Sequence, residues 1–285
     1  MDELAKRYLR QQIEIGGPEL LISHGGALPE QKPSQEVASI AGNDASAASR
    51  PRGDGGHGEA PREPKPSRER TPKDWRAGAP PIPGPGLTIA TPAVDLLSPR
   101  GPEWNTLDDV ARDIAQCRKC FLCEGRKKVV PGEGSSKADM VFVGEGPGQT
   151  EDETGRPFVG KAGELLTDIL GALGLKREQV FICNVVKCRP PQNRKPLPDE
   201  MSACYPYLEA QLALIQPRVI VAMGATAAEA LLQTRRSLAD LRSKVHSYRG
   251  IPLVVTYHPA ALLRNPNWKK PTWDDVRIAR QLIDR

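Results

Sequence analysis

The sequence predicts an α/β fold: three α/β/α layers around a central four-stranded parallel sheet, preceded by a disordered N-terminal region. Short apolar runs alternate with amphipathic helical patterns in residues 104–285, which is typical of a parallel sheet covered by helices on both faces. Residues 16–103 are instead rich in Pro, Gly, Ser and Ala. A segment of this composition cannot bury enough apolar surface to offset the entropy lost on ordering.

Three regions follow from these patterns. Residues 1–15 are expected to form a short amphipathic helix with Leu4, Tyr8 and Leu9 on one face, which could dock on a partner protein or simply be a frayed helix. Residues 16–103 are expected to be a Pro/Gly-rich linker. Residues 104–285 are long enough to form one domain with its own core.

The elements of the folded region can be placed in order. A helix is expected from Thr106 through Cys117, because Thr106 can cap it and Asp108 and Asp109 suit its first turn. In the last helix, Thr272 and Asp275 resemble a capping box. The expected strands are 140–143, 180–185, 219–223 and 253–257, and the other helices are 161–173, 199–216, 225–233 and 272–283.

The charge of the chain is unevenly distributed. Residues 1–100 carry 13 Lys and Arg and 13 Asp and Glu, so the net charge of +5 lies in residues 101–285. This excess is compatible with phosphate contacts without establishing them. No signal peptide or membrane span is expected, because residues 1–12 are polar and no apolar run approaches the length that a bilayer requires. We therefore expect a cytoplasmic protein whose thiols stay reduced.

Four cysteines have the spacing of a metal site. Cys117 and Cys120 are separated by two residues at the end of the first predicted helix. Cys188, after the second predicted strand, and Cys204, early in the next predicted helix, are separated by fifteen residues. Four thiolates suit either zinc or a [4Fe–4S] cluster. Cys123 extends the first pair and is an alternative ligand to Cys120.

Cysteines can also be ordinary small apolar core residues. That interpretation suits Cys183, which lies inside a predicted strand. It suits Cys117 and Cys120 poorly, because Arg118 and Lys119 lie between them. The sequence therefore favours a metal site over four unrelated core cysteines.

The loop at residues 144–163 indicates a ligand site. It contains six glycines, two prolines and the single aromatic residue Phe158, between a predicted buried strand and a predicted helix. Glycine lets the backbone approach a ligand closely. Open α/β sheets bind their ligands at the carboxyl ends of the strands, where this loop begins.

Two further polar residues lie at strand ends. Asn184 stands near the end of the second strand and His258 directly after the fourth. These two residues and Phe158 each have a simpler interpretation: Asn184 as a turn residue, His258 as a loop residue and Phe158 as a core residue. Because parallel strand ends meet at one sheet edge, the three together indicate chemistry on a planar, amide-like ring. The amide can read such a ring, Phe158 can stack on it, and the imidazole can stabilise a leaving anion.

The chain resembles the iron–sulfur (type 4) uracil-DNA glycosylases over residues 106–284. The motifs that carry the resemblance are GEGPG at 144–148, Glu151 with Asp152, TGRPFVGKAG at 154–163, NVVKCRPP at 184–191 and HPAALL at 258–263. The resemblance implies an enzyme that flips uracil out of DNA, hydrolyses its N-glycosidic bond and leaves an abasic site. It implies that Phe158 stacks on uracil, that Asn184 reads its amide edge and that His258 stabilises the uracil anion.

The resemblance also assigns roles around this centre. Glu145 and Gly146 would shape the water-side wall, and Glu151 would crowd the 5-position of the ring and so exclude thymine. The best-known sister family has Asp at the position of Gly146. We therefore expect a dissociative reaction, with an oxocarbenium-like sugar and late addition of water.

The same resemblance implies a structural [4Fe–4S] cluster on Cys117, Cys120, Cys188 and Cys204. Lys187 and Arg189 would then meet DNA phosphates, and Leu262 and Arg264 would fill the vacated base stack. Single- or double-stranded DNA containing uracil is the expected partner of a monomeric, nucleoid-associated protein. Two alternatives remain open: a related glycosylase for other deaminated bases, and a non-catalytic, metal-stabilised DNA-binding relative.

Overall fold

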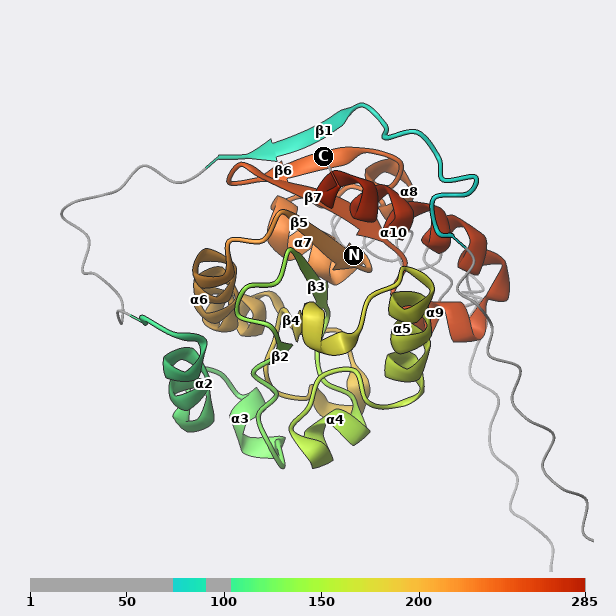
Figure 1. Cartoon of the computed structure of the whole chain (residues 1–285). Coiled ribbons are helices and arrows are strands. Elements are labelled where there is room, and N and C mark those ends of the chain that lie inside the picture. Colours follow the sequence, from blue (N-terminus) through green and yellow to red (C-terminus); the bar gives the residue numbers. More distant parts are fainter. Residues whose placement is uncertain (1–73, 91–103, 285) are drawn as a thin grey trace, which may run out of the picture. The chain divides into compact units, whose positions relative to one another are not determined.

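The computed structural model describes residues 74–90 and 104–284, which contain a mixed sheet of strand order β1-β6-β7-β5-β3-β4-β2 (Figure 1). Its centre is the predicted parallel set: β3 (Met140–Gly144), β4 (Phe181–Asn184), β5 (Val219–Met223) and β7 (Ile251–Thr256). β3 lies between β4 and β5, and β5 pairs with β7. The predicted fold class is confirmed.

Three outer strands were not predicted: β1 (Pro85–Ile89), β2 (Glu133–Gly134) and β6 (Val245–Tyr248). β2 is antiparallel to β4, β6 is antiparallel to β7, and β1 is parallel to β6. These segments are too short or too rich in Pro and Gly to give a strand pattern. The sheet is therefore wider than expected and mixed at its edges.

The segment 74–90 corrects the predicted linker. Trp75 is 8% exposed and packs in a cluster with Leu173 and Val276. Arg277 donates to the Ala77 carbonyl at 3.1 Å, and Gln281 donates to that of Pro80 at 2.9 Å. The prediction of a disordered linker over 16–103 is thus wrong for these residues. The predicted helix 1–15 and the rest of the linker lie outside the described residues.

The long helices agree with the predicted ones within a few residues. They are α2 (Leu107–Gln116), α5 (Lys161–Ala172), α6 (Pro198–Ile215), α7 (Ala225–Leu232) and α10 (Lys269–Ile283). Shorter helices that were not predicted are α3 (Leu122–Gly125), α4 (Gln149–Thr154), α8 (Leu238–Leu241) and α9 (Pro259–Arg264), with 3-10 turns η1 (Arg177–Gln179), η2 (Pro191–Asn193) and η3 (Pro266–Trp268).

One of the two predicted helix caps is present. Thr106 Oγ1 accepts the Asp109 N–H at 3.1 Å, and Asp109 accepts the Thr106 N–H at 2.9 Å. The second prediction was wrong, because α10 begins at Lys269. Asp275 is instead buried and accepts hydrogen bonds from Arg242 and Thr256, at 2.8 and 2.7 Å.

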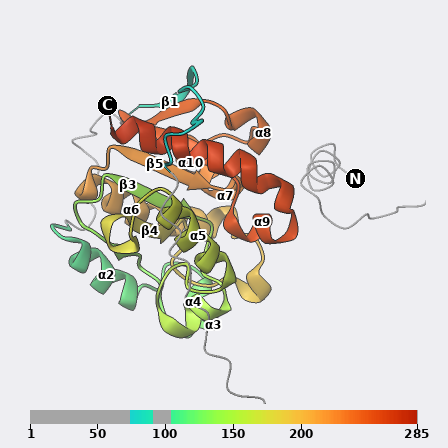
Figure 2. The same ribbon diagram turned by 45° about the vertical axis from the view of Figure 1, so that its right-hand side comes forward.

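Alternate residues of the strands build two hydrophobic layers. Val141 and Val143 belong to the cluster that includes residues of α2, α6 and α7, whereas Met140 and Phe142 belong to the one that includes residues of α5 and α10. Figure 2 shows α5 and α10 on one side of the sheet. Because alternate residues of a strand face opposite sides of the sheet, each side packs against its own set of helices. This is the three-layer arrangement that the sequence predicts. Within the described ranges, no helix has the length and apolar character needed to span a bilayer.

Candidate active site and thiol centre

The ends of β3, β4 and β7 bring Phe158, Asn184 and His258 together. Gly144 pairs with Asn184 in the register of β3 and β4, and His258 follows β7 and caps α9. The Phe158 and His258 ring centroids are 5.4 Å apart, with 36° between the ring planes. A Cβ atom placed on Gly144 would lie 2.5 Å from both Asn184 Oδ1 and Phe158 Cζ. Gly144, the first residue of the predicted ligand loop, therefore leaves room for these two side chains.

His258 is held as a neutral hydrogen-bond donor. Its Nδ1 accepts the Ala260 N–H at 3.2 Å. Burial, helped by Arg264 and opposed by Glu151, lowers the pKa of His258 to about 4. Since Nδ1 is an acceptor, the neutral ring carries its proton on Nε2. That Nε2 atom is buried and has no partner among the described residues.

Asn184 leaves a second buried polar atom without a partner. The residue is 1% exposed, and its Oδ1 atom accepts no hydrogen bond within the described part of the chain. Buried polar atoms are nearly always hydrogen-bonded in folded proteins, because an unmade bond costs about 1–3 kcal/mol. An acceptor on Asn184 and a donor on His258 are thus both available to a bound ligand.

Phe158 is held in an unfavourable backbone conformation. Its φ of +51° lies in the left-handed region, which bulky residues rarely adopt. Arg177 donates to the carbonyls of Pro157 and Phe158 at 2.8 and 3.0 Å. A Cβ atom on Gly163 would lie 1.9 Å from the Phe158 carbonyl oxygen. Such strain persists where surrounding contacts enforce it and is common at functional sites.

The Glu151 carboxylate binds three backbone N–H groups of the loop. Its Oε1 atom accepts the N–H groups of Val159 and Gly160 at 2.9 and 2.8 Å, and Oε2 accepts that of Gly148 at 3.1 Å. Both oxygens therefore join the start of α4 to the residues that follow Phe158. In this structure Glu151 acts as a clamp on the loop.

Glu145 and Gly146 lie beside the segment that follows β4. The Glu145 carbonyl accepts the Val186 N–H at 3.1 Å, and its carboxylate accepts a short hydrogen bond from Thr226 on α7. A Cβ atom on Gly146 would lie 2.8 Å from Val186 Cγ2. Thr226 was missed by sequence reasoning, because nothing in its local pattern distinguishes it from a core helix residue.

Two of the four predicted DNA-contacting residues are buried. Lys187 is 1% exposed, and its Nζ atom donates to the Asn184 carbonyl and to Gln211 Oε1 at 2.8 and 2.7 Å. Leu262 is also 1% exposed. Neither side chain is placed to reach DNA, so both assignments were wrong. Lys187 lies in the irregular segment after β4, where no period fixes the direction of a side chain, and Leu262 lies on α9, a short helix that the sequence did not predict.

The neighbouring residues are more accessible. Leu263 is 48% exposed on α9, and Arg264 is exposed next to it. Arg189 is half-buried and donates to Asn193 Oδ1 at 2.8 Å. The accessible leucine of the HPAALL motif is therefore Leu263, one position after the predicted one.

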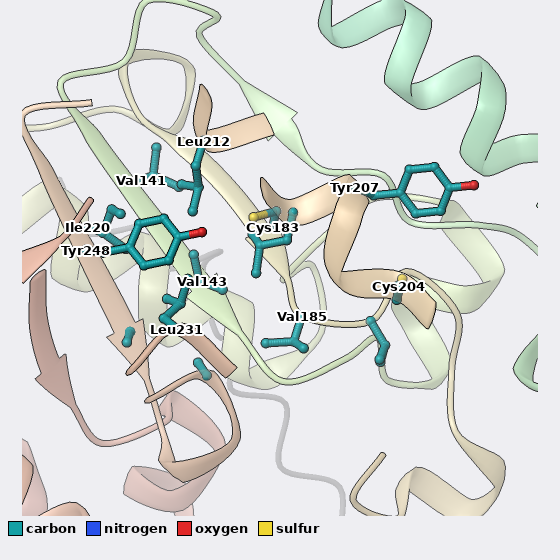
Figure 3. Close-up of a cluster of buried hydrophobic side chains, with 14 of the residues drawn as sticks. Val141, Val143, Cys183, Val185, Cys204, Tyr207, Leu212, Ile220, Leu231 and Tyr248 are labelled. Atoms are coloured by element: carbon teal, nitrogen blue, oxygen red, sulfur yellow. The ribbon is translucent and has the colours of Figure 1, made fainter. Parts of the chain in front are cut away.

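A second site is built from thiols. One recess is lined by five of the six cysteines: Cys117, Cys120, Cys123, Cys188 and Cys204. They come from the end of α2, from the turn through α3, from the segment after β4 and from α6. All six cysteines of the chain are free thiols. The sixth cysteine, Cys183 on β4, packs among core valines, as predicted (Figure 3). Cys204 and Tyr207 project from α6 in the same view.

Two of the sulfurs at the recess are buried and accept hydrogen bonds. Burial raises the pKa of Cys204 to about 12, and burial also raises the pKa of Cys188. Arg126 and the Lys187 N–H nevertheless donate to the sulfurs of Cys188 and Cys204 at 3.2 and 3.3 Å. Thiolates at buried positions need a positive partner. Over the described ranges, no three His, Cys, Asp or Glu side chains gather around one point as a single metal ion requires.

The fold and the first site together define an α/β enzyme that binds its ligand at the carboxyl ends of parallel strands. The profile of the family described as "Uracil DNA glycosylase superfamily" matches residues 131–279. The chain therefore belongs to the uracil-DNA glycosylase superfamily, and its resemblance to the type-4 members is confirmed by individual relatives.

Three relatives illustrate the match. A type-4 uracil-DNA glycosylase of Sulfurisphaera tokodaii is 45% identical over 187 residues, which are 62% of this chain and 85% of the relative. One of Pyrobaculum aerophilum is 50% identical over 161 residues, 54% of this chain and 82% of the relative. A type-5 uracil-DNA glycosylase of Thermus thermophilus is 35% identical over 153 residues, 45% of this chain and 68% of the relative.

Proposed function

We propose that this protein is a monofunctional uracil-DNA glycosylase, which hydrolyses the N-glycosidic bond of uracil in DNA and leaves an abasic site. The observation that carries the proposal is the pair of buried atoms without partners, Asn184 Oδ1 and His258 Nε2, beside the Phe158 ring. Uracil presents an N3–H donor that suits the first and an O2 acceptor that suits the second. The names of the type-4 relatives support the same activity.

The reaction follows from these positions. Uracil leaves the DNA stack and lies against Phe158, while the Asn184 amide accepts from N3–H and donates to O4. The bond from C1′ to N1 breaks, and its electron pair moves onto the base. His258 stabilises the negative charge that develops at O2 through its Nε2–H. Water then adds to the cationic C1′ and releases its proton to solvent. Gly146 offers no carboxylate base, so the attack of water comes late.

The roles of the remaining site residues are proposals of the same kind. Glu145 and Gly146 shape the water-side wall. Glu151 positions Phe158 through the loop clamp and crowds the 5-position of the ring, which excludes thymine. Leu263 takes the role expected of Leu262 and fills the vacated base stack together with Arg264, while Arg189 faces the DNA backbone. A monomeric, cytoplasmic protein remains the expectation from the sequence, with residues 1–15 either docking on a partner protein or forming a frayed helix.

We further propose that Cys117, Cys120, Cys188 and Cys204 hold a structural [4Fe–4S] cluster. Five thiols at one recess and the type-4 relatives support this assignment. When bound, the cluster would join α2, α6 and the segment after β4 through its iron–sulfur bonds. Cys123 lines the same recess and stays an alternative to Cys120. Iron analysis of Cys120→Ala and Cys123→Ala separates the two, because only the variant that lacks a ligand should lose iron.

The decisive experiment is uracil release from labelled single-stranded and U:G oligonucleotides, read as alkali-sensitive cleavage. His258→Ala should slow release about 10²–10³-fold, since it removes the donor to the leaving anion. His246→Gln is the matched control: His246 is a buried histidine, but its ring binds the Leu87 N–H and the Leu241 carbonyl. It should lower stability and keep the rate.

Other outcomes would contradict the proposal. An unchanged rate in His258→Ala would remove His258 from the mechanism. No release by iron-replete wild-type protein would favour the alternatives, which the same assay separates with oligonucleotides that contain hypoxanthine or xanthine. Release of those bases alone would indicate a glycosylase for other deaminated bases. No release at all would indicate a non-catalytic DNA-binding relative.

A further inference from the structure

Lys187 is a buried cation whose position the proposed mechanism does not explain. Its side chain is 1% exposed, and Nζ donates to the Asn184 carbonyl and to Gln211 Oε1. Both acceptors are uncharged. Across the part of the chain that the structure describes, no carboxylate forms an ion pair with Lys187. A buried ammonium group without a counter-charge is unfavourable, so a negative group is expected close to it.

The thiol recess supplies such a group. Lys187 lines the recess together with Cys188 and Cys204. Its own N–H donates to Cys204 Sγ at 3.3 Å, and its ammonium charge opposes the rise in the Cys204 pKa that burial causes. A cluster held by four thiolates has a net negative charge, which responds to nearby charges and hydrogen bonds.

The same residue reaches the proposed base site. Lys187 Nζ holds the carbonyl of Asn184, whose side chain carries one of the two atoms without partners. The residues between them are also fixed: the N–H groups of Val185 and Val186 donate to the Gly144 and Glu145 carbonyls at 2.9 and 3.1 Å. The segment from Asn184 to Cys188 therefore joins the two sites directly.

We propose that Lys187 is a positioning residue that balances the negative charge of the thiol-bound cluster and, through the Asn184 carbonyl, fixes the amide that reads uracil. The inference rests on the proposed function at both sites. It assigns Lys187 to the interior of the enzyme and explains why a cation in the NVVKCRPP motif is kept away from the DNA surface. Loss of the cluster would leave the ammonium group uncompensated and so disturb Asn184.

Three substitutions in the iron-loaded protein test this role. Lys187→Met removes the charge, and Gln211→Met removes one acceptor of Nζ but keeps the charge. Lys195→Met is the matched control, because Lys195 is half-exposed and pairs with Glu229. The readouts are the reduction potential of the cluster, the rate of iron release to a chelator, and the KM and kcat for a uracil oligonucleotide.

Lys187→Met should shift the potential to more negative values, release iron faster and raise KM about tenfold, with a smaller change in kcat. Gln211→Met should raise KM and leave the potential near that of the wild type. Lys195→Met should change none of these. A Lys187→Met protein with wild-type potential and iron release would overturn the charge role, and an unchanged KM would overturn the link to Asn184.

If Lys187→Met fails to fold, Lys187→Arg takes its place. Arginine keeps the charge and alters the geometry, so the potential should stay near the wild-type value while KM rises. If the reduction potential of the Lys187→Arg cluster shifted to negative values by as much as the loss of one positive charge predicts, the inference would be overturned. The proposed function fails separately: wild-type protein that contains no iron or releases no uracil would contradict it before any Lys187 variant is compared.

Discussion

The two sites lie at opposite ends of one five-residue segment, Asn184 to Cys188. They differ in whether their buried polar atoms and sulfurs are hydrogen-bonded. At the base site, Asn184 Oδ1 and His258 Nε2 are buried and have no partner in the described chain. At the thiol centre, Cys188 and Cys204 each accept an N–H. The first arrangement suits a neutral ring that brings its own donor and acceptor, and the second suits sulfurs that carry negative charge. One site is prepared to exchange its ligand and the other to keep it.

Removing a cysteine from the thiol centre should have the largest effect. Cys204→Ala should abolish stoichiometric iron binding and lower Tm by about 10 °C, which corresponds to about 3 kcal/mol in a domain of this size. Cys183→Ala is the control, because Cys183 is fully buried in β4 but does not line the recess. It should keep its iron. Iron analysis and thermal unfolding measure both, and iron loss from both variants would contradict the assignment.

A substitution that fills space at the base site should reduce uracil release and leave iron binding at the thiol centre unchanged. In Gly144→Ala the new methyl group would lie 2.5 Å from Asn184 Oδ1 and Phe158 Cζ, so both side chains must move. We expect kcat/KM for uracil release to fall about 100-fold, as for the loss of 1–3 kcal/mol of hydrogen bonding, with iron content unchanged. Gly171→Ala, with no atom near its added Cβ, should leave both properties as they are. Wild-type kcat/KM in Gly144→Ala would contradict this geometry.

A core substitution remote from both sites should change neither. Trp75→Ala should lower the free energy of unfolding by about 3 kcal/mol, because it empties the cluster with Leu173 and Val276. Iron retention and kcat should stay at wild-type values. Trp104→Ala is the contrast, since the Trp104 ring centroid lies 5.3 Å from that of Tyr207, which lines the thiol recess. It should speed iron release to a chelator. Equal iron release from both variants would show that packing near the recess has no specific effect.

The smallest expected effect is that of pH on catalysis. With a His258 pKa of about 4, the imidazole stays neutral at higher pH, so the rate constant for uracil release should be constant between about pH 5.5 and 8. Single-turnover assays across this range measure it. A step near pH 6.5 would indicate that His258 titrates as it does in an unfolded chain.

The same pKa predicts how stability depends on pH. Between about pH 6.5 and 4 the unfolded chain binds a proton on His258 that the native protein excludes, so the free energy of unfolding falls as the pH falls through this range. His258→Ala should lose less stability over the range than the wild type. His246, whose pKa burial also lowers, contributes equally in both proteins. Denaturant titrations at several pH values measure the difference, and parallel curves would contradict the depressed pKa.

The sequence by itself determined the centre of the fold and the identity of the chemistry. β3, β4, β5 and β7 are continuous apolar runs, which only a doubly covered sheet explains. The glycine-laden loop, Asn184 and His258 follow strand ends, and parallel strands bring such ends to one edge. Cysteine spacing likewise anticipated four of the five thiols at the recess as candidate ligands, with Cys123 as the alternative.

Only the tertiary structure decided where side chains in irregular segments point. Lys187 belongs to the irregular segment after β4 and Leu262 to the short helix α9, which the sequence did not predict, and packing turns both side chains inward. The tertiary structure also places three backbone N–H groups within hydrogen-bond distance of the Glu151 carboxylate. It further pairs β1, from a Pro-rich segment, with β6 at the edge of the sheet. Local patterns determine which elements form, whereas contacts between residues distant in sequence determine which polar atoms are left free to act.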